Sequence, residues 1–275
     1  MKLATYKDGS RNGQLVVVAR DLSTAHYATG IAHTLQQVLD DWNFLAPQLQ
    51  DLYVTLNQGK ARHAFPFDPR LCMPPLPRPP GVLWAADLPH SGRSDGWRGP
   101  VADLPWPAPA ATSGTALVAL GVITGDIPAA TGDDEALESV RLLTLAHAVG
   151  ASAAGRLADG AADAPWCVAF APVAVTPDEC GAAWERGRLH LPWHLKVEGR
   201  AARVLDAASA PCAAGEVLAA AVRDVGLGAG SAVLLPVSAT VAASDGPSLH
   251  VVLEMRGRDG ASVFGQLDQT LVMAE

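Results

Sequence analysis

The stretch Ala116-Leu-Val-Ala-Leu-Gly-Val-Ile-Thr-Gly-Asp-Ile-Pro128 decides how this chain is interpreted. From Ala116 to Thr124 it contains no charged side chain, and a run of this kind indicates a buried strand. The nearest carboxylates follow the strand, at Asp126 and at 133–135. There they fall in a turn and at the start of a helix, where carboxylates ordinarily cap the helix and stabilise its positive end.

Further blocks of sequence, at both ends and in the middle of the chain, point to one protein family. They are MKLATYKDGSRNGQLVVVARDLSTAHYATGIA (1–32), LQQVLDDWNFLAPQLQDLY (35–53), GKARHAFPFDPR (59–70), VITGDIP (122–128), AFAPVAVTPDE (169–179) and EMRGRDGASVFGQLDQ (254–269). Together these blocks resemble the fumarylacetoacetate hydrolase family. The resemblance implies an α+β fold, in which a small N-terminal α/β domain precedes a strand-rich C-terminal domain built as a mixed β-sandwich roll.

The resemblance also implies a metal site that this chain has lost. Family members typically hold Mg²⁺, Mn²⁺ or Ca²⁺ through a Glu of a His-x-x-Glu-like segment, a Glu-x-Glu pair and a later Asp, beside a catalytic Lys. Such hard cations need several oxygen ligands. The Glu-x-Glu positions fall on Leu117 and Ala119, and a helix-ending Asn-Asp falls on His147 and Ala148. Leu117, Ala119 and Ala148 have no side-chain atom that binds a metal, so we expect neither a metal nor another cofactor.

Other parts of the family site are altered as well. The Ser-Lys-Pro segment falls on 164–166, which reads Ala-Pro-Trp and lacks the lysine amine. The Tyr-x-x-His-x-x-Glu region reads GVLWAADLPHSGRSDGW (81–97), where His90 is the one relic, and the Gly-Ser-Gly-Thr substrate loop falls within 234–240. Loss of several elements of one site favours a non-hydrolytic protein.

Composition describes a folded protein and excludes some partners. With 275 residues, of which 49% are hydrophobic, the chain can bury a sizeable core. A net charge of −8 and a pI near 5.4 argue against nucleic acid and anionic membranes as partners. The four cysteines form no Cys-x-x-Cys pair, so no zinc site or disulfide framework is indicated. The sequence begins without a signal peptide's apolar run and contains no apolar stretch of about 20 residues, which predicts a cytoplasmic location.

We expect two domains. Residues 1–71 form the N-terminal domain, with a strand at 14–19 and helices at 34–42 and 46–57. The segment 72–80 is rich in proline, which lacks an amide donor and restricts the preceding residue, so it is expected to be a linker.

Residues 81–275 form the C-terminal domain. Apolar periodicity predicts helices at 135–149 and 214–225, and the second proline-rich stretch at 100–109 is expected to run as an extended surface loop. Strands are predicted at 249–255 and 262–267, on either side of a hairpin turn with Asp-Gly.

Three side chains are candidates for catalysis. By resemblance His147 faces the active site, and the alternative is a histidine at a helix end facing the helix dipole. His90 and Arg93 could act as a general acid or base and as an anion anchor, with Asp95 orienting the imidazole. The alternative for His90 and Arg93 is a polar surface loop.

Two further patterns are weaker. The pair His190 and His194 has the i, i+4 spacing of a zinc site, but Pro192 argues against the helix that this site needs, so solvated histidines are favoured. The glycines of 226–231 follow a predicted helix and precede a strand, which is the reverse of a dinucleotide-binding loop. Tryptophans at 84, 97, 106, 166 and 193 either fill space or line a cleft for an apolar or aromatic ligand.

Three functions follow from these observations. The favoured one is a non-hydrolytic paralogue that acts as a scaffold or partner subunit, in a homo-oligomer, with a dimer preferred, or in a hetero-oligomer with an active family member. The first alternative is a metal-independent lyase, isomerase or cyclase that uses acid–base chemistry in the old cavity. The second is a metal-dependent hydrolase of a β-diketo acid.

Overall fold

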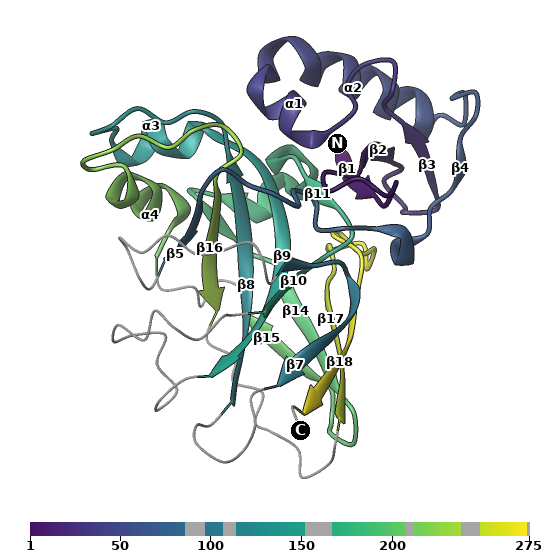
Figure 1. The fold of residues 1–275 in the computed structure, drawn as a ribbon, viewed down its shortest axis with the longest axis vertical. Coiled ribbons are helices and arrows are strands. Elements are labelled where there is room, and N and C mark those ends of the chain that lie inside the picture. The colour runs from purple at the N-terminus through teal and green to yellow at the C-terminus, as the bar shows by residue number, and fades with distance from the viewer. Residues whose placement is uncertain (86–96, 107–113, 152–166, 207–211, 238–247, 274–275) are drawn as a thin grey trace.

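Two β-sheets packed face to face form the body of the molecule, and a small helical layer covers one end (Figure 1). The computed structural model describes residues 1–85, 97–106, 114–151, 167–206, 212–237 and 248–273. Within these residues the large sheet has 11 strands and the small sheet has five.

The large sheet runs in the order β4-β3-β2-β1-β11-β9-β8-β16-β5, with β10 and β6 attached beside β9. Its strands are β1 (Lys2–Tyr6), β2 (Gln14–Val18), β3 (Thr24–Tyr27), β4 (Phe65–Pro66), β5 (Val82–Trp84), β6 (Trp97–Arg98), β8 (Gly114–Thr124), β9 (Val140–Ala151), β10 (Cys167–Phe170), β11 (Ala174–Val175) and β16 (Ala232–Val237).

The small sheet runs in the order β15-β14-β17-β18-β7. Its strands are β7 (Val101–Trp106), β14 (Pro192–Val197), β15 (Arg203–Asp206), β17 (Ser248–Met255) and β18 (Leu267–Met273). The remaining elements are α1 (Leu35–Asp40), α2 (Trp42–Asn57), α3 (Asp133–Glu138), α4 (Ala214–Ala221), the 3-10 helices η1 (Pro69–Leu71) and η3 (Pro177–Ala183), and the pair β12 (Trp184–Glu185) and β13 (Arg188–Leu189).

Strands β8 and β9 form the centre of the large sheet and are buried on both faces. Side chains alternate between faces along a strand. Val118 and Leu145 therefore point toward the small sheet and join the core between the sheets, together with Trp193 of β14, which is fully buried. Truncation of such a tryptophan to alanine typically costs about 3–5 kcal/mol. The alternate side chains of β8 and β9 point to the outer face.

The outer face of β8 and β9 is divided between two apolar clusters. Near the N-terminal domain, Ile123 and Leu142 pack with Leu35 of α1 and Leu49 of α2. Helix α1 begins at a capping box in which the Thr34 hydroxyl and the Gln37 side chain each bond to the other residue's backbone amide. The other part of this face is the candidate site described below.

The expected fold class is confirmed: the protein is α+β and rich in strands. The strand predicted at 14–19 and the two N-terminal helices are present as β2, α1 and α2, and α4 matches the helix predicted at 214–225 but ends at Ala221. Residues 73–80 adopt neither helix nor strand. The boundary of the N-terminal domain stays a prediction, since β1 pairs with β11 and so joins that domain to the large sheet.

Three predicted elements were wrong in whole or part. The helix predicted at 135–149 is the short α3 followed by β9, because a strand buried on both faces is a continuous apolar run that periodicity does not separate from a helix. The loop predicted at 100–109 contains β7, where Pro105 is tolerated at the sheet edge. Strand β17 is present as predicted, but its partner β18 begins at Leu267, after a turn in which Gly265 has φ of 78°.

None of the described helices is long and apolar enough to cross a membrane. The cytoplasmic location predicted from the sequence stays a prediction.

Candidate functional site

The positions to which the family resemblance assigns the metal ligands lie together on the outer face of β8 and β9. Leu117 of β8 pairs with Ala148 of β9, and Ala119 pairs with Ala146. The four side chains therefore share one face, and each is buried. The register of two long antiparallel strands brings these positions together.

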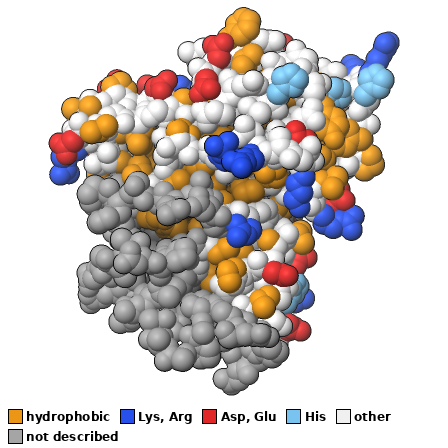
Figure 2. Space-filling model, in the orientation of Figure 1, with side chains coloured by type: hydrophobic (Ala, Val, Ile, Leu, Met, Phe, Trp, Pro, Cys, Tyr) orange, Lys and Arg blue, Asp and Glu red, His pale blue; other side chains and the backbone are white. Residues whose placement is uncertain are grey.

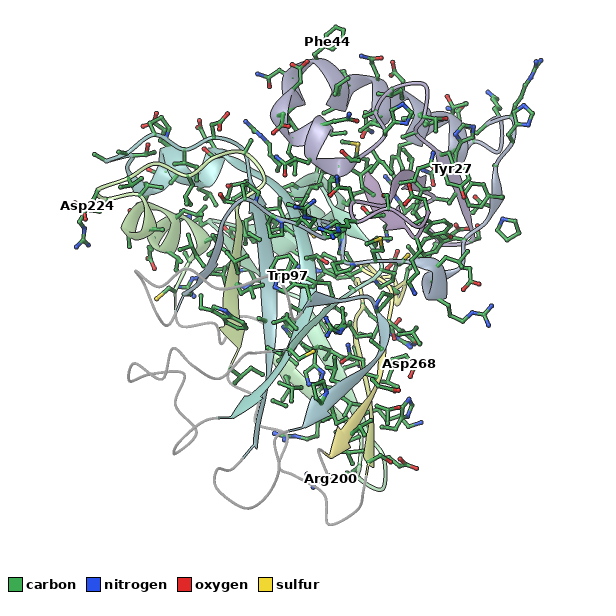
Figure 3. The ribbon with its side chains drawn as sticks, viewed as in Figure 1. Tyr27, Phe44, Trp97, Arg200, Asp224 and Asp268 are labelled. Carbon is green, nitrogen blue, oxygen red and sulfur yellow. The ribbon has the colours of Figure 1, made fainter. Side chains whose placement is uncertain are left out.

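This part of the outer face is apolar. We call it the alanine face, and it is defined by the buried residues Val82, Trp84, Trp97, Ala119, Ala146, Ala148, Val168, Phe170, Ala232 and Leu234. The rings of Trp97 and Phe170 lie with centroids 4.3 Å apart and planes tilted by 44°. Trp97 lies against the large sheet near the middle of the molecule (Figure 3). Alanine and aromatic side chains thus occupy the face on which a cation would need oxygen ligands.

One polar atom of the alanine face has no partner. The indole Nε1 of Trp97 is buried and makes no hydrogen bond among the described residues. An unmet buried N–H of this kind costs roughly 1–3 kcal/mol. It is a donor, so it cannot serve as a metal ligand.

The carboxylates that follow β8 in the sequence have structural roles. Asp126 accepts a hydrogen bond from the backbone N–H of Ala229, at 2.9 Å, and so holds the turn before β16. Asp133, Asp134 and Glu135 lie in the first turn of α3, where they face the positive end of the helix. Within the described part of the chain, no three His, Cys, Asp or Glu side chains gather closely enough to hold a metal ion.

His147 lies on β9 between Ala146 and Ala148, so its side chain points to the opposite face, into the core between the sheets. It is fully buried, and its Nδ1 lies 2.6 Å from Oε1 of Gln269 on β18. Because the amide oxygen accepts, Nδ1 donates and Nε2 is an acceptor. Among the described residues, this acceptor has no partner, and neither does the Gln269 amide nitrogen, which is a donor. Burial lowers the pKa of His147, although the bond to Gln269 opposes this, and the ring is therefore neutral at pH 7.

The structure thus does not bring His147 to the alanine face. Its alternative placement at a helix end is wrong, because it lies within a strand. His90, Arg93 and Asp95 lie outside the described residues, as do residues 164–166, and their roles stay predictions. Trp84, Trp97 and Trp193 are buried.

The histidine pair and the glycine-rich segment 226–231 both have structural interpretations. His190 is exposed before β14 and His194 is partly exposed on that strand, so the two histidines are solvated. The glycines of 226–231 lie between α4 and β16, in the order that argued against a dinucleotide-binding loop.

A buried carboxylate that the sequence did not single out connects the N-terminal domain to the core. Glu179 lies 3.1 Å from the Met1 amine, accepts a 2.8 Å hydrogen bond from the Tyr53 hydroxyl and binds Arg20 through two nitrogens at 3.2 Å. Burial by itself would raise the pKa of Glu179, but these partners outweigh it and the pKa is lowered. In the sequence, Glu179 is marked only as the last residue of the block AFAPVAVTPDE, and nothing there connects it to these partners.

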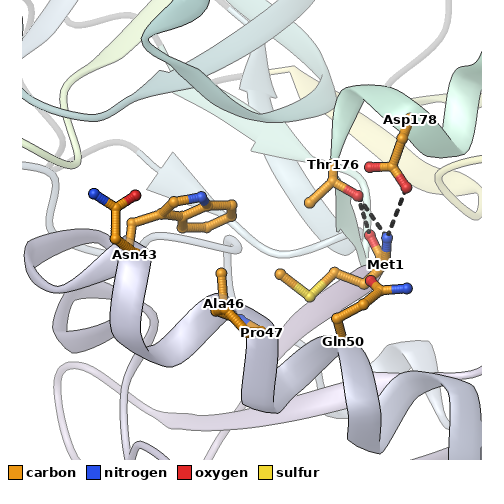
Figure 4. A pocket seen from close by; sticks show the side chains of 8 residues that line it. Met1, Asn43, Ala46, Pro47, Gln50, Thr176 and Asp178 are labelled. Carbon is orange, nitrogen blue, oxygen red and sulfur yellow. Dashed lines mark hydrogen bonds and ion pairs between the residues drawn. The ribbon is translucent and has the colours of Figure 1, made fainter.

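A pocket of about 300 Å³ lies beside this carboxylate (Figure 4). It opens between α2, which contributes Trp42, Ala46 and Pro47, and the segment that holds Thr176 and Asp178. Two of its polar groups are already engaged by the protein, because the Thr176 hydroxyl and the Asp178 carboxylate both contact the Met1 amine. We assign the pocket no ligand.

The two packed sheets, the N-terminal helical layer and the position of the alanine face define a protein with the fumarylacetoacetase type of fold. Residues 1–78 match the family model of the fumarylacetoacetase N-terminal domain 2. This match covers the first 78 of the 275 residues, and the chain as a whole shares its fold with the solved structures of fumarylacetoacetate hydrolase-family proteins named below.

Solved structures similar to the chain include several enzymes, each aligned over 100% of both chains. They are maleylpyruvate hydrolase from Sphingobium sp. SYK-6 (14% identity, TM-score 0.71), a putative HpcE protein from Mycobacterium smegmatis (16%, 0.68) and fumarylacetoacetate hydrolase from Exiguobacterium antarcticum (16%, 0.64). No curated protein matches the chain in sequence. Identities this low establish the shared fold and leave activity open.

Proposed function

We propose that this protein is a non-hydrolytic member of the family, which has lost the divalent-metal chemistry and acts as a scaffold or partner subunit. The observation that supports this most is the alanine face. By resemblance, Leu117, Ala119 and Ala148 stand at the positions of the family's carboxylates. All three are buried, and Ala119 and Ala148 lie in one apolar cluster with Trp97 and Phe170.

The physical argument concerns both the ligands and their surroundings. A hard divalent cation needs oxygen ligands to replace its water, and alkyl side chains supply none. A dry apolar surface also opposes the presence of the ion, because charge is poorly solvated there. A chain that places alanine and leucine at these positions stabilises its fold by apolar packing in place of metal binding.

Calorimetric titration with Mn²⁺ and Mg²⁺ tests the proposal, followed by titration with pyruvate in the presence of Mn²⁺. These probes are chosen because one structure of the Sphingobium maleylpyruvate hydrolase contains manganese(II) and pyruvate. We expect no stoichiometric binding and no hydrolysis of acylpyruvate substrates. Stoichiometric Mn²⁺ binding together with hydrolysis would contradict the proposal and favour the metal-dependent hydrolase.

A metal-independent enzyme is the second candidate, and one observation favours it. His147 is a neutral imidazole whose Nε2 has no partner among the described residues. Because the ring is fully buried between the sheets, it would act as a base on a substrate that enters this core. If His147 acts on a substrate, an activity found by screening carboxylated enols will be lost in His147→Gln while the variant remains folded. Retained activity in that variant would remove His147 from the mechanism.

The partner of the scaffold is the other open question. Native mass spectrometry of protein taken gently from its source cells separates the possibilities. A homo-oligomer or a complex with an active family member supports the scaffold role, and a bound small organic molecule of defined mass favours a cavity that binds an apolar or aromatic ligand. A monomer with neither partner nor ligand would contradict the proposal.

A further inference from the structure

Four aromatic rings gather on the N-terminal part of the large sheet. They belong to Tyr6 of β1, Tyr27 of β3, Phe65 of β4 and Phe67, which follows β4, and they are called the aromatic face below. Along β3, Tyr27 and Ala25 point to the same side, and Ala25 pairs with Phe65. The alternate residues of β1 and β2 pack against α1 and α2, so the aromatic face lies on the side of the sheet away from these helices.

The rings are held in place, and solvent reaches part of them. Tyr6 is buried and stacks on Phe67, with centroids 5.9 Å apart and planes 15° apart, and the centroids of Tyr27 and Phe65 lie 4.8 Å apart. Tyr27 is 40% exposed, and both phenylalanines are partly exposed. The Tyr6 hydroxyl accepts a 2.7 Å hydrogen bond from the backbone N–H of Asp68, which fixes the segment that carries the phenylalanines. Fixed rings lose little conformational entropy when a partner packs on them.

Basic side chains border the aromatic face in the segment that leads into β4. Lys60, Arg62 and His63 are all exposed there. His26 of β3 joins this segment to the rings, because its Nε2 lies 2.7 Å from the carbonyl oxygen of Arg62 and its Nδ1 lies 2.7 Å from that of Tyr27. Where Figure 3 labels Tyr27, Figure 2 shows a hydrophobic area with histidine and basic side chains beside it.

The charge of this region contrasts with that of the rest of the chain. Residues 1–78 contain eight Lys or Arg and six Asp or Glu, a net charge of +2. The whole chain carries −8, so residues 79–275 carry −10. A short acidic segment is therefore attracted to this region and repelled by the remainder, whereas a long polyanion would extend onto acidic surface.

The sheet edge beside the rings favours contact through side chains. Strand β4 ends the large sheet, has only two residues, and the second of them is Pro66, which lacks an amide donor. Such an edge is a poor template for an added strand. An extended segment that lies across the rings can still place alternate side chains on them and direct the others toward the bordering cations.

We propose that the aromatic face binds a partner protein through an extended acidic segment that carries an aromatic side chain. The aromatic side chain of the segment packs on Tyr27 and Phe65, and its carboxylates lie beside Lys60 and Arg62. The inference rests on the proposed function, because it names the kind of partner that a scaffold subunit holds. It concerns a different surface from the alanine face, so the two proposals can fail separately.

Fluorescence anisotropy of a labelled random copolymer of glutamate and tyrosine, titrated with the full chain, tests the inference. We expect binding in the micromolar range at about 50 mM salt, weakened by salt at about 300 mM. Polyglutamate without tyrosine should bind at least tenfold more weakly. Tyr27→Ala should weaken binding of the copolymer at least tenfold, as should Arg62→Glu, which keeps the rings and changes only an exposed side chain.

The chain offers a matched control for each variant. Phe44→Ala removes a ring that is 67% exposed on α2 and lies apart from Tyr27, and it should leave binding unchanged (Figure 3). Arg223→Glu makes the same charge change as Arg62→Glu at an exposed position after α4, and it should weaken binding less than twofold.

Three results would overturn the inference. They are no binding of the copolymer at about 100 µM protein, copolymer binding by Tyr27→Ala and Arg62→Glu as tight as the parent's, and tighter binding of an oligouridylate of about ten nucleotides than of the copolymer. Stoichiometric Mn²⁺ binding with hydrolysis would instead overturn the proposed function, and binding of the copolymer in that case would show the aromatic face to be a docking surface of an enzyme.

Discussion

Replacement of Ala148 by aspartate measures whether the alanine face is dry. Ala148 is fully buried and lies between Leu117 of β8 and Val168 of β10. A carboxyl introduced there has no charged partner among these neighbours, so burial should raise its pKa and keep it protonated in the folded state. The family has an aspartate at this position by resemblance, which makes the substitution a test of function as well as of packing.

The expected cost follows from proton linkage. Holding a carboxyl protonated at pH 7, against an unfolded pKa of about 3.9, costs roughly 4 kcal/mol, since each unit corresponds to about 1.4 kcal/mol. Because the folded pKa is raised, the folded state binds more protons than the unfolded state, and stability is lost as pH rises above about 4. The loss should be only about 1.5 kcal/mol at pH 5. A net stability of about 5–15 kcal/mol tolerates the change at low pH and is severely reduced at high pH.

Urea denaturation of the Ala148→Asp and Ala148→Asn variants at pH 5 and pH 7 provides the measurement. The asparagine variant has nearly the same volume and introduces no titratable group, so its cost should not change with pH. The difference between the two variants should grow by about 2.7 kcal/mol between pH 5 and pH 7. Equal stability at both pH values would refute the reasoning, and stabilisation of the aspartate variant by Mn²⁺ would reveal further ligands and contradict the proposed function.

Three other predictions concern buried polar groups. Gln269→Leu should cost roughly 1–3 kcal/mol in urea denaturation because it leaves the His147 donor unpaired, whereas the double variant His147→Leu/Gln269→Leu should cost less than the sum of the two single changes. Glu179→Gln should lower the free energy of unfolding by about 3 kcal/mol at pH 7, and because the folded pKa of Glu179 is lowered, the difference from the parent should close as pH falls below about 4.5. The control is Asp178→Asn, whose side chain is 69% exposed and which should change stability by no more than about 0.5 kcal/mol. A difference between Glu179→Gln and the parent that does not depend on pH would argue against the ion pairs. Burial lowers the pKa of Lys2 to about 8, so with rising pH the folded protein loses this proton before the unfolded chain does. Its contribution to the free energy of unfolding should therefore rise between about pH 8 and 10.5. In guanidinium denaturation the variant Lys2→Met should lack this rise, and a pH profile equal to that of the parent would contradict the lowered pKa.

Much of the fold was predictable because it depends on local signals. The capping residue Thr34 and the apolar spacing of the segments that became α1 and α2 are readable in one chain. β9 was not predictable as a strand, because Leu142 to Val149 is apolar at nearly every position and such a run has no period. Pro105 led to the opposite error, a loop predicted where the structure has β7, because only the tertiary fold shows that this strand lies at a sheet edge.

The candidate site was predictable in part for a related reason. Alignment with the family put Leu117, Ala119 and Ala148 at equivalent positions, and the register of β8 and β9 brings these residues onto one face. The same alignment put His147 beside them, and one residue along a strand is enough to send its side chain to the opposite face. The Glu179 cluster was missed because its partners are Met1, Arg20 and Tyr53, which no spacing in the sequence connects to it.

The two faces of β9 stabilise the fold in different ways. On one face, His147 and Gln269 form a hydrogen-bonded pair inside the core, which constrains how the two sheets meet because each polar group is costly without the other. On the opposite face, alanines at 146 and 148 let Trp97 and Phe170 pack over the large sheet. A metal site requires several carboxylates, which repel one another when no ion is bound. Apolar packing at these positions favours a fold that is stable without an ion. Under the proposed function, a protein with this arrangement acts through its surfaces, by binding other chains.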